Sequence, residues 1–127
     1  MSISNLVLER VIITNNPAVV KAFPVDSCFI KGGVHKVFIT VRDAVHKGAR
    51  IITHPLTGSV KPNESPYKSV VITVTTGKLD MKSLSIIEDA IATLARLPDR
   101  KREYDESVLE DFRIIDLNFI RIADLTL

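Results

Sequence analysis

The chain has 127 residues, 46% of them hydrophobic and 25% charged, which is enough apolar material for one core of useful size. Seventeen basic against fifteen acidic side chains give a formal charge of +2, and basic residues cluster only near Arg96 and at 100–102. A positive charge this small and this scattered does not indicate a nucleic-acid partner. We expect a single domain over residues 1–127.

The sequence carries no signal for export, membrane insertion or metal binding. Its opening, "MSISNLVLER", lacks the basic region followed by an apolar run that marks a secretory signal. No apolar stretch approaches the roughly 20 residues needed to span a bilayer. Cys28 is the single cysteine, and His35, His46 and His54 do not cluster at metal-ligand spacing. We therefore expect a cytoplasmic protein with no membrane partner, no metal and no cofactor.

In the first half of the chain, short β-branched runs alternate with a helical pattern. The sequence predicts strands over 10–14 and 25–31, with one or two helical turns over 18–23 between them. From Val34 the apolar residues recur at helical spacing, and Gly48 supplies a C-terminal cap, so a longer helix is expected there. Within the second strand, a buried and inert Cys28 thiol is the commoner case.

The second half continues the alternation. Strands are predicted over 49–53 and 68–75. A long helix follows, with Asp80 as its N-cap and Pro98 just beyond its end. Ser107, with Glu110 three residues later, forms a capping-box pattern that opens the last segment.

Two interpretations remain open for that last segment, residues 107–127. We favour a helix with a break near Asp116, although the many β-branched residues would also suit a strand after Asp111. One helical stripe is formed by Val108, Phe112, Ile115, Phe119 and Ile122. The apolar residues outside that stripe are Ile114, Leu117, Ile120 and Leu125. They would pack in the core or meet a second subunit, so a homodimer through this segment stays open.

The alternation of elements predicts the fold class and the place of a binding site. It indicates a small α/β sandwich with a mainly parallel sheet of about four strands flanked by helices. In parallel sheets, ligands bind beyond the carboxyl ends of the strands. Two polar segments follow strand ends, "TNNP" after the first and "THPLTGSVKPNESPYKS" (53–69) after the third. If those strands are parallel neighbours, Asn15, Asn16 and His54 share one rim with Ser59 and Lys61.

The loop over 53–69 is the most distinctive stretch of the chain. Loops of this length without secondary structure are uncommon and are often functional or disordered. Three prolines and three apolar anchors, Leu56, Val60 and Tyr67, indicate an ordered loop. The expected ligand-binding residues are Asn15, Asn16, His54, Gly58, Ser59, Lys61, Asn63, Glu64, Tyr67 and Lys68.

These residue types favour an anion. Lys61 and Lys68 supply positive charge, Ser59 and Asn63 supply donors, and backbone N–H groups around Gly58 would form a nest for a phosphate or carboxylate. The alternative is a structural loop whose polar groups satisfy its own backbone.

The segments "TNNP", "THPLTGSVKPNESPYKSVVIT" and "SLSIIEDAI" resemble those of the GrdX family, over a stretch from Val11 to Asp116. These small proteins are encoded beside the glycine, sarcosine and betaine reductase systems of amino-acid-fermenting anaerobes. The resemblance implies a cytoplasmic accessory role near a selenoprotein reductase that makes acetyl phosphate, with a protein of that reductase system as a partner. The resemblance implies which genes lie nearby and does not imply a particular reaction.

Two functional hypotheses follow. The first is a non-catalytic module that binds a small anionic metabolite or a partner protein at the rim of Asn15, His54 and Lys61. The second is a small hydrolase or transferase that acts on a phosphorylated or acyl compound, with His54 as general base and Lys61 as electrostatic stabiliser. We favour the first, because no nucleophile stands out beside His54 in the sequence.

Overall fold

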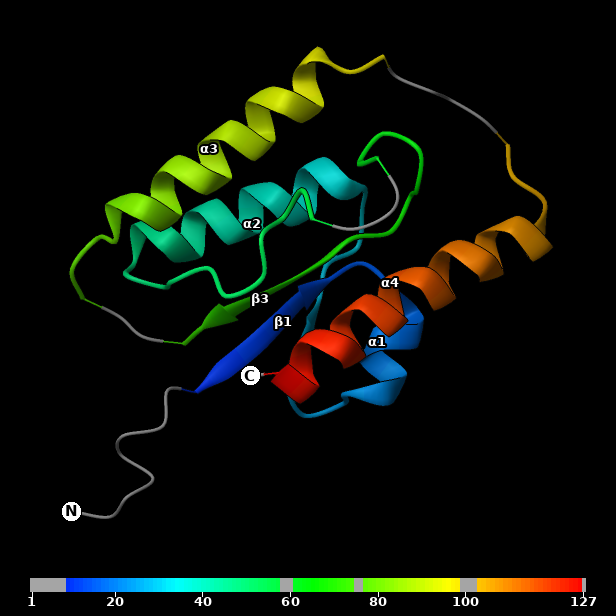
Figure 1. Ribbon diagram of the computed structural model, residues 1–127, viewed down its shortest axis with the longest axis horizontal. Coiled ribbons are helices and arrows are strands. Elements are labelled where there is room, and N and C mark those ends of the chain that lie inside the picture. The colour runs from blue at the N-terminus through cyan, green and yellow to red at the C-terminus, as the bar shows by residue number, and fades with distance from the viewer. Residues whose placement is uncertain (1–8, 58–60, 75–76, 99–102, 127) are drawn as a thin grey trace.

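A computed structural model describes residues 9–57, 61–74, 77–98 and 103–126 (Figure 1). Within these ranges the chain forms a three-stranded sheet and four helices. Their bounds, in chain order, are β1 Arg10–Thr14, α1 Pro17–Ala22, β2 Ser27–Phe29, α2 Val34–His46, β3 Ser69–Thr73, α3 Met81–Arg96 and α4 Glu106–Thr126. The predicted mixture of helices and strands is confirmed.

Alternation along the strands divides the hydrophobic core into two layers. Successive side chains of a strand point to opposite faces of the sheet. Ile13 of β1 packs with α2 and α3 on one face, whereas Ile12 packs with α1 and α4 on the other. Val71 of β3 joins the second layer, and its neighbours in the strand join the first. Both faces are therefore covered by helices (Figure 1), which explains why β3 is buried along its whole length.

The sheet is mixed, and the prediction of a mainly parallel sheet of about four strands was wrong. Its order is β2-β1-β3, with β1 parallel to β2 and antiparallel to β3. The connection from α2 to β3 does not cross over to a parallel position. The long loop instead returns the chain so that β3 begins where β1 ends (Figure 1).

The expected strand over 49–53 is only an isolated antiparallel bridge between Ile51 and Ile72 of β3. Side-chain hydroxyls replace part of the regular ladder there. The Val71 amide donates to Thr53 Oγ1 at 2.8 Å, and the Arg50 amide donates to Thr73 Oγ1 at 2.8 Å. This segment therefore lies along β3 and closes its outer edge without forming a full strand.

At the other edge of the sheet, β2 is shorter than predicted. It covers three residues, and Cys28 and Phe29 are exposed. The expectation of a buried Cys28 thiol was wrong, because β2 is an edge strand of the sheet and Cys28 is exposed there.

The helices follow their sequence signals closely, with one exception. Asp80 caps α3 as predicted, since its Oδ2 accepts from the amide of Ser83 at 3.2 Å. The final segment is one continuous helix, so the predicted break near Asp116 was wrong. This helix begins at Glu106, and its first turn bonds to the carbonyl of Asp105, which places Ser107 inside the helix and not at its cap.

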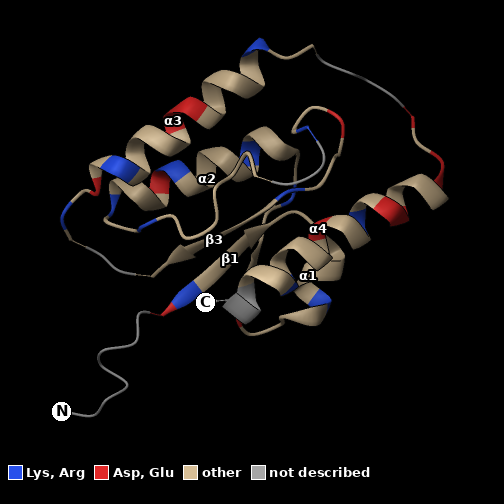
Figure 2. Ribbon diagram, in the orientation of Figure 1, with Lys and Arg blue, Asp and Glu red and all other residues tan. Residues whose placement is uncertain are grey.

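No helix in the described ranges combines the length and hydrophobicity needed to cross a bilayer. Among the described residues, Lys and Arg occur on several elements (Figure 2).

Truncating the core aromatic of α2 tests the two-layer arrangement. Phe38 is 0% exposed, so Phe38→Ala should lower the free energy of unfolding by about 3–5 kcal/mol through lost burial and a residual cavity. Val25 is 90% exposed, so Val25→Ala should change the free energy of unfolding by less than about 0.5 kcal/mol. Urea unfolding followed by circular dichroism measures both, and equal effects of the two substitutions would contradict this core.

Candidate functional site

Asn15 fastens the long loop to the end of β1. Because β3 runs antiparallel to β1, the beginning of β3 lies beside Asn15. Asn15 Nδ2 donates to the carbonyls of Gly32 at 2.9 Å and Pro66 at 2.8 Å, and its Oδ1 accepts from the Lys68 amide at 2.8 Å. The side chain is buried, and these three bonds use most of its capacity. Asn15 is therefore a brace for the loop.

Asn16, the next residue, fastens the opposite layer. Its Oδ1 accepts from the Ala18 amide at 3.0 Å and caps α1. Its Nδ2 donates to two groups of α4, the Arg113 carbonyl at 2.9 Å and Asp116 Oδ2 at 3.0 Å. The two adjacent asparagines that follow β1 thus bind different parts of the fold: Asn15 binds the loop, and Asn16 binds α1 and α4.

Asp116 ends a chain of buried hydrogen bonds. Ser69 Oγ donates to Asp116 Oδ2 at 2.7 Å, and Thr14 Oγ1 lies 2.6 Å from Ser69 Oγ. Since the Ser69 hydrogen points to the carboxylate, Thr14 must donate to Ser69, while Thr14 accepts from the Asn16 amide at 2.9 Å. Burial raises the pKa of Asp116, and the hydrogen bonds from Ser69 and Asn16 and the charge of Lys68 oppose that rise.

Lys68 brings a positive charge into the same region. It is 8% exposed, its Nζ donates to the Thr57 carbonyl at 3.0 Å, and the Phe119 ring centroid lies 6.0 Å away. Burial lowers the pKa of Lys68, and the charge of Asp116 opposes that shift. No direct ion pair joins Lys68 to Asp116, both of which lie in the described part of the chain.

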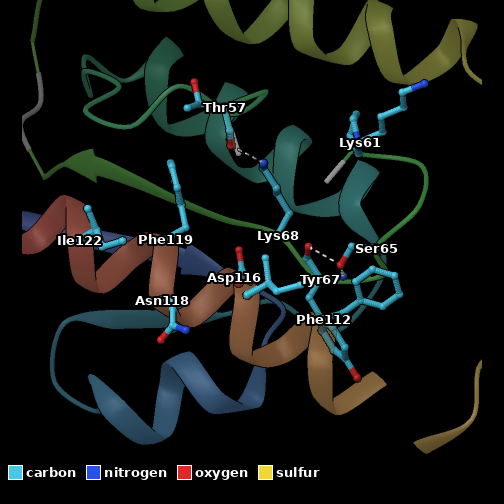
Figure 3. A pocket seen from close by; sticks show the side chains of 12 residues that line it. Thr57, Lys61, Ser65, Tyr67, Lys68, Phe112, Asp116, Asn118, Phe119 and Ile122 are labelled. Carbon is cyan, nitrogen blue, oxygen red and sulfur yellow. Dashed lines mark hydrogen bonds between the residues drawn. The ribbon is translucent and has the colours of Figure 1, made fainter. Parts of the chain in front are cut away.

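A pocket of about 390 Å³ lies between the loop and α4, with Lys68 and Asp116 as its buried charged groups. Figure 3 shows Lys68 reaching toward Thr57, with Asp116 and Phe119 approaching from α4. The other walls of the pocket are largely apolar, and Lys61 lies exposed at the rim of the pocket. The described residues that line the pocket are Thr57, Lys61, Pro62, Ser65, Tyr67, Lys68, Phe112, Ile115, Asp116, Asn118, Phe119 and Ile122.

Two aromatic contacts hold the loop against α4. Arg113 Nη1 donates to Tyr67 Oη at 2.9 Å, and the guanidinium carbon lies 5.6 Å from the centroid of the Tyr67 ring. Arg113 is in turn paired with Glu106 and Glu110. Tyr104 Oη, just before α4, donates to the Glu64 carbonyl at 2.7 Å. These contacts fix the outer wall of the pocket.

The structure brings together only part of the predicted rim. Lys61, Tyr67 and Lys68 line the pocket, while Asn15 and Asn16 brace the elements around it. His54 is exposed, and its Nδ1 accepts from the Leu56 amide at 3.1 Å.

Four further residues were predicted for the rim. Asn63 Nδ2 donates to the Pro98 carbonyl at 3.1 Å, and the Glu64 amide donates to the Lys61 carbonyl at 3.0 Å. Gly58 and Ser59 lie outside the described residues.

A second cavity, of about 610 Å³, lies between the start of α2, the loop and the end of α3. Asn15, Asn63 and Tyr67 line it, but among the residues that the structure describes no Lys, Arg, Asp or Glu does. His54 lines neither cavity. Among the described residues, no group of three His, Cys, Asp or Glu side chains could hold a metal ion. The pocket with Lys68 is therefore the better candidate for a charged ligand.

Sequence reasoning missed the contribution of α4. The stripe of Phe112, Ile115, Phe119 and Ile122 lines the pocket, whereas Leu117 and Ile120, which lie outside that stripe, pack in the second core layer. Ile114 stays 43% exposed. The missed signal was the lone acid within "RIIDLNFI" (113–120), since a carboxylate among apolar residues on one helix needs buried partners.

The titration of Asp116 provides a test of the network. Its raised pKa means that the folded chain binds this proton more tightly than the unfolded chain. The contribution of Asp116 to the free energy of unfolding therefore falls as the pH rises from 3.8 through the raised folded value. The Asp116→Asn variant has no carboxyl group to titrate at this position. The free energy of unfolding of the wild type minus that of the variant should therefore fall as the pH rises through this range. Urea unfolding of both proteins at a series of pH values measures it, and a difference that grows with pH would contradict the burial of this acid.

Comparison with known proteins agrees with the family that the long loop suggests. The family described as GrdX-like protein matches residues 11–123, which is most of the chain. No curated protein and no solved structure matches the chain. The match includes the loop and nearly all of α4, the two segments that line the pocket, and nearly all of β1. The chain therefore belongs to the GrdX-like protein family.

Proposed function

We propose that the protein is a non-catalytic binding module for a small anionic metabolite, held in the pocket between the loop and α4. The observation that carries this proposal is the buried ammonium of Lys68. An ammonium has three donors, and within the described ranges the Lys68 Nζ makes one hydrogen bond, to Thr57. A desolvated cation with donors to spare, lining a cavity, is a strong anchor for an anion.

The other residues of the pocket limit which types of anion fit it. Asp116 lines it too, and its negative charge disfavours a doubly charged group such as a phosphate more than a singly charged carboxylate. The walls from Phe112, Phe119 and Ile122 offer apolar contact to the remainder of the molecule. A carboxylate with an apolar body therefore fits better than a phosphate ester.

Membership of the GrdX-like family supports a cytoplasmic accessory role associated with glycine reductase. In that setting the module would sense or carry a carboxylate metabolite, or present the loop to a protein of the reductase system. The alternative of a hydrolase or transferase with His54 as general base is less well supported, because His54 is exposed and lines neither cavity.

Removing the Lys68 charge tests this proposal. Isothermal titration with phenyllactate, a carboxylate with an apolar ring, should show one site in the parent protein. Lys68→Gln should weaken binding by about 10–100-fold, the loss expected for a charge-assisted hydrogen bond. Lys61→Gln, at the exposed rim, should weaken it by less than about threefold, because a solvated charge contributes little.

Circular dichroism checks that both variants fold. Binding that survives Lys68→Gln unchanged would contradict the assigned anchor. If neither phenyllactate nor a set of aliphatic carboxylates binds the folded parent protein, the proposal of a metabolite site fails and docking of a reductase-system protein replaces it.

A further inference from the structure

We infer that the Lys68 amine forms a reversible imine with its ligand, which makes the ligand a carbonyl compound that also carries a carboxylate, such as an α-keto acid. This inference rests on the proposed function, because it assigns a covalent step to the same pocket. It is carried by the arrangement of a buried primary amine, an acid and apolar walls around one cavity.

The surroundings of Lys68 suit a nucleophile. Lysine amines that form imines are commonly activated by desolvation, since burial disfavours the ammonium form. Lys68 is almost fully buried and lines the pocket, and the hydrogen bond from Nζ to Thr57 fixes the position of the nitrogen. The lowered pKa of Lys68 agrees with this geometry. Lys61 lines the same pocket, but its side chain is exposed to solvent.

Asp116 supplies the proton transfers that the step requires. The Lys68 ammonium first passes one proton to Asp116, the neutral amine attacks the carbonyl carbon, and the carbonyl oxygen takes a proton back from Asp116 as the carbon–nitrogen bond forms. The nitrogen then loses a second proton to Asp116, the hydroxyl group takes that proton and leaves as water, and a protonated imine remains. Asp116 is the acidic residue that lines the pocket, and burial raises its pKa, so its carboxyl group is suited to pass these protons.

Charge is conserved by this step, which suits the buried network. A protonated imine carries the same positive charge as the ammonium that it replaces. Asp116 accepts hydrogen bonds from Ser69 and Asn16. At Lys68, the pocket contains one positively charged nitrogen before the reaction, as the ammonium, and one after it, as the protonated imine. The apolar walls from α4 limit the water that would hydrolyse the imine.

Reductive trapping tests the inference. The folded full-length protein is incubated with phenylpyruvate and sodium cyanoborohydride, which reduces protonated imines. One Lys68 adduct should form, heavier than the protein by the keto acid less one oxygen atom, and peptide mass spectrometry locates it. Lys68→Arg keeps the positive charge but has no amine, so it should bind phenyllactate and yield no adduct. Lys82→Arg, at an exposed position of α3 outside both cavities, should be trapped at the parent rate.

The two proposals fail in different ways. Binding of phenyllactate and phenylpyruvate without an adduct would overturn the imine and leave the binding module intact. Adducts spread over several exposed lysines, or an adduct that persists in folded Lys68→Arg, would also overturn it. Absence of binding by both acids would overturn the proposed function as well. If Lys68→Arg does not fold, protection of the parent protein from trapping by excess phenyllactate decides whether the reaction occurs in the pocket.

Discussion

The buried carboxylate of Asp116 is the constraint on which the rest of the structure depends. One of its oxygens accepts hydrogen bonds from Ser69 of β3 and from Asn16 at the start of α1. Isolated charges are very costly to bury, so α4 must dock at the single rotation that supplies these donors. That rotation turns Leu117 and Ile120 toward the core and leaves Phe112 and Phe119 to form the pocket wall. The position of the candidate site thus follows from the hydrogen bonds of one acid.

The second requirement is the direction of β3. Its antiparallel pairing with β1 brings the end of the long loop to Asn15, and one side chain then orders the loop through the Pro66 carbonyl and the Lys68 amide. A parallel β3 would place Lys68 at the far end of the sheet, away from Asn15 and Asp116. Mixed pairing therefore brings the only two buried charges of the described residues into one pocket.

Much of the fold could be predicted from the sequence because its signals are local. The spacing from Val34, the cap at Asp80 and the β-branched run of β1 each act within a few residues, and the structure confirms those elements. Strand direction and the face that α4 buries depend on contacts between distant residues, such as Asn16 with Asp116. The composition of the loop predicted that it contributes to a candidate site. The apolar stripe of α4 gave no such signal, since it looks the same whether it faces a core or a pocket, and only Asp116 indicated buried partners.

The distance along the chain between the two walls of the pocket has a consequence for biosynthesis. The loop ends at Lys68, but the facing wall begins only at Phe112 in the last helix. On the ribosome, Lys68 and Ser69 emerge well before Asp116, which accepts the hydrogen bond from Ser69, so the pocket closes late, when α4 docks. A ligand that binds only the closed pocket would stabilise the docked helix by mass action. Metabolite supply would then set how long a newly made chain keeps its final helix in place.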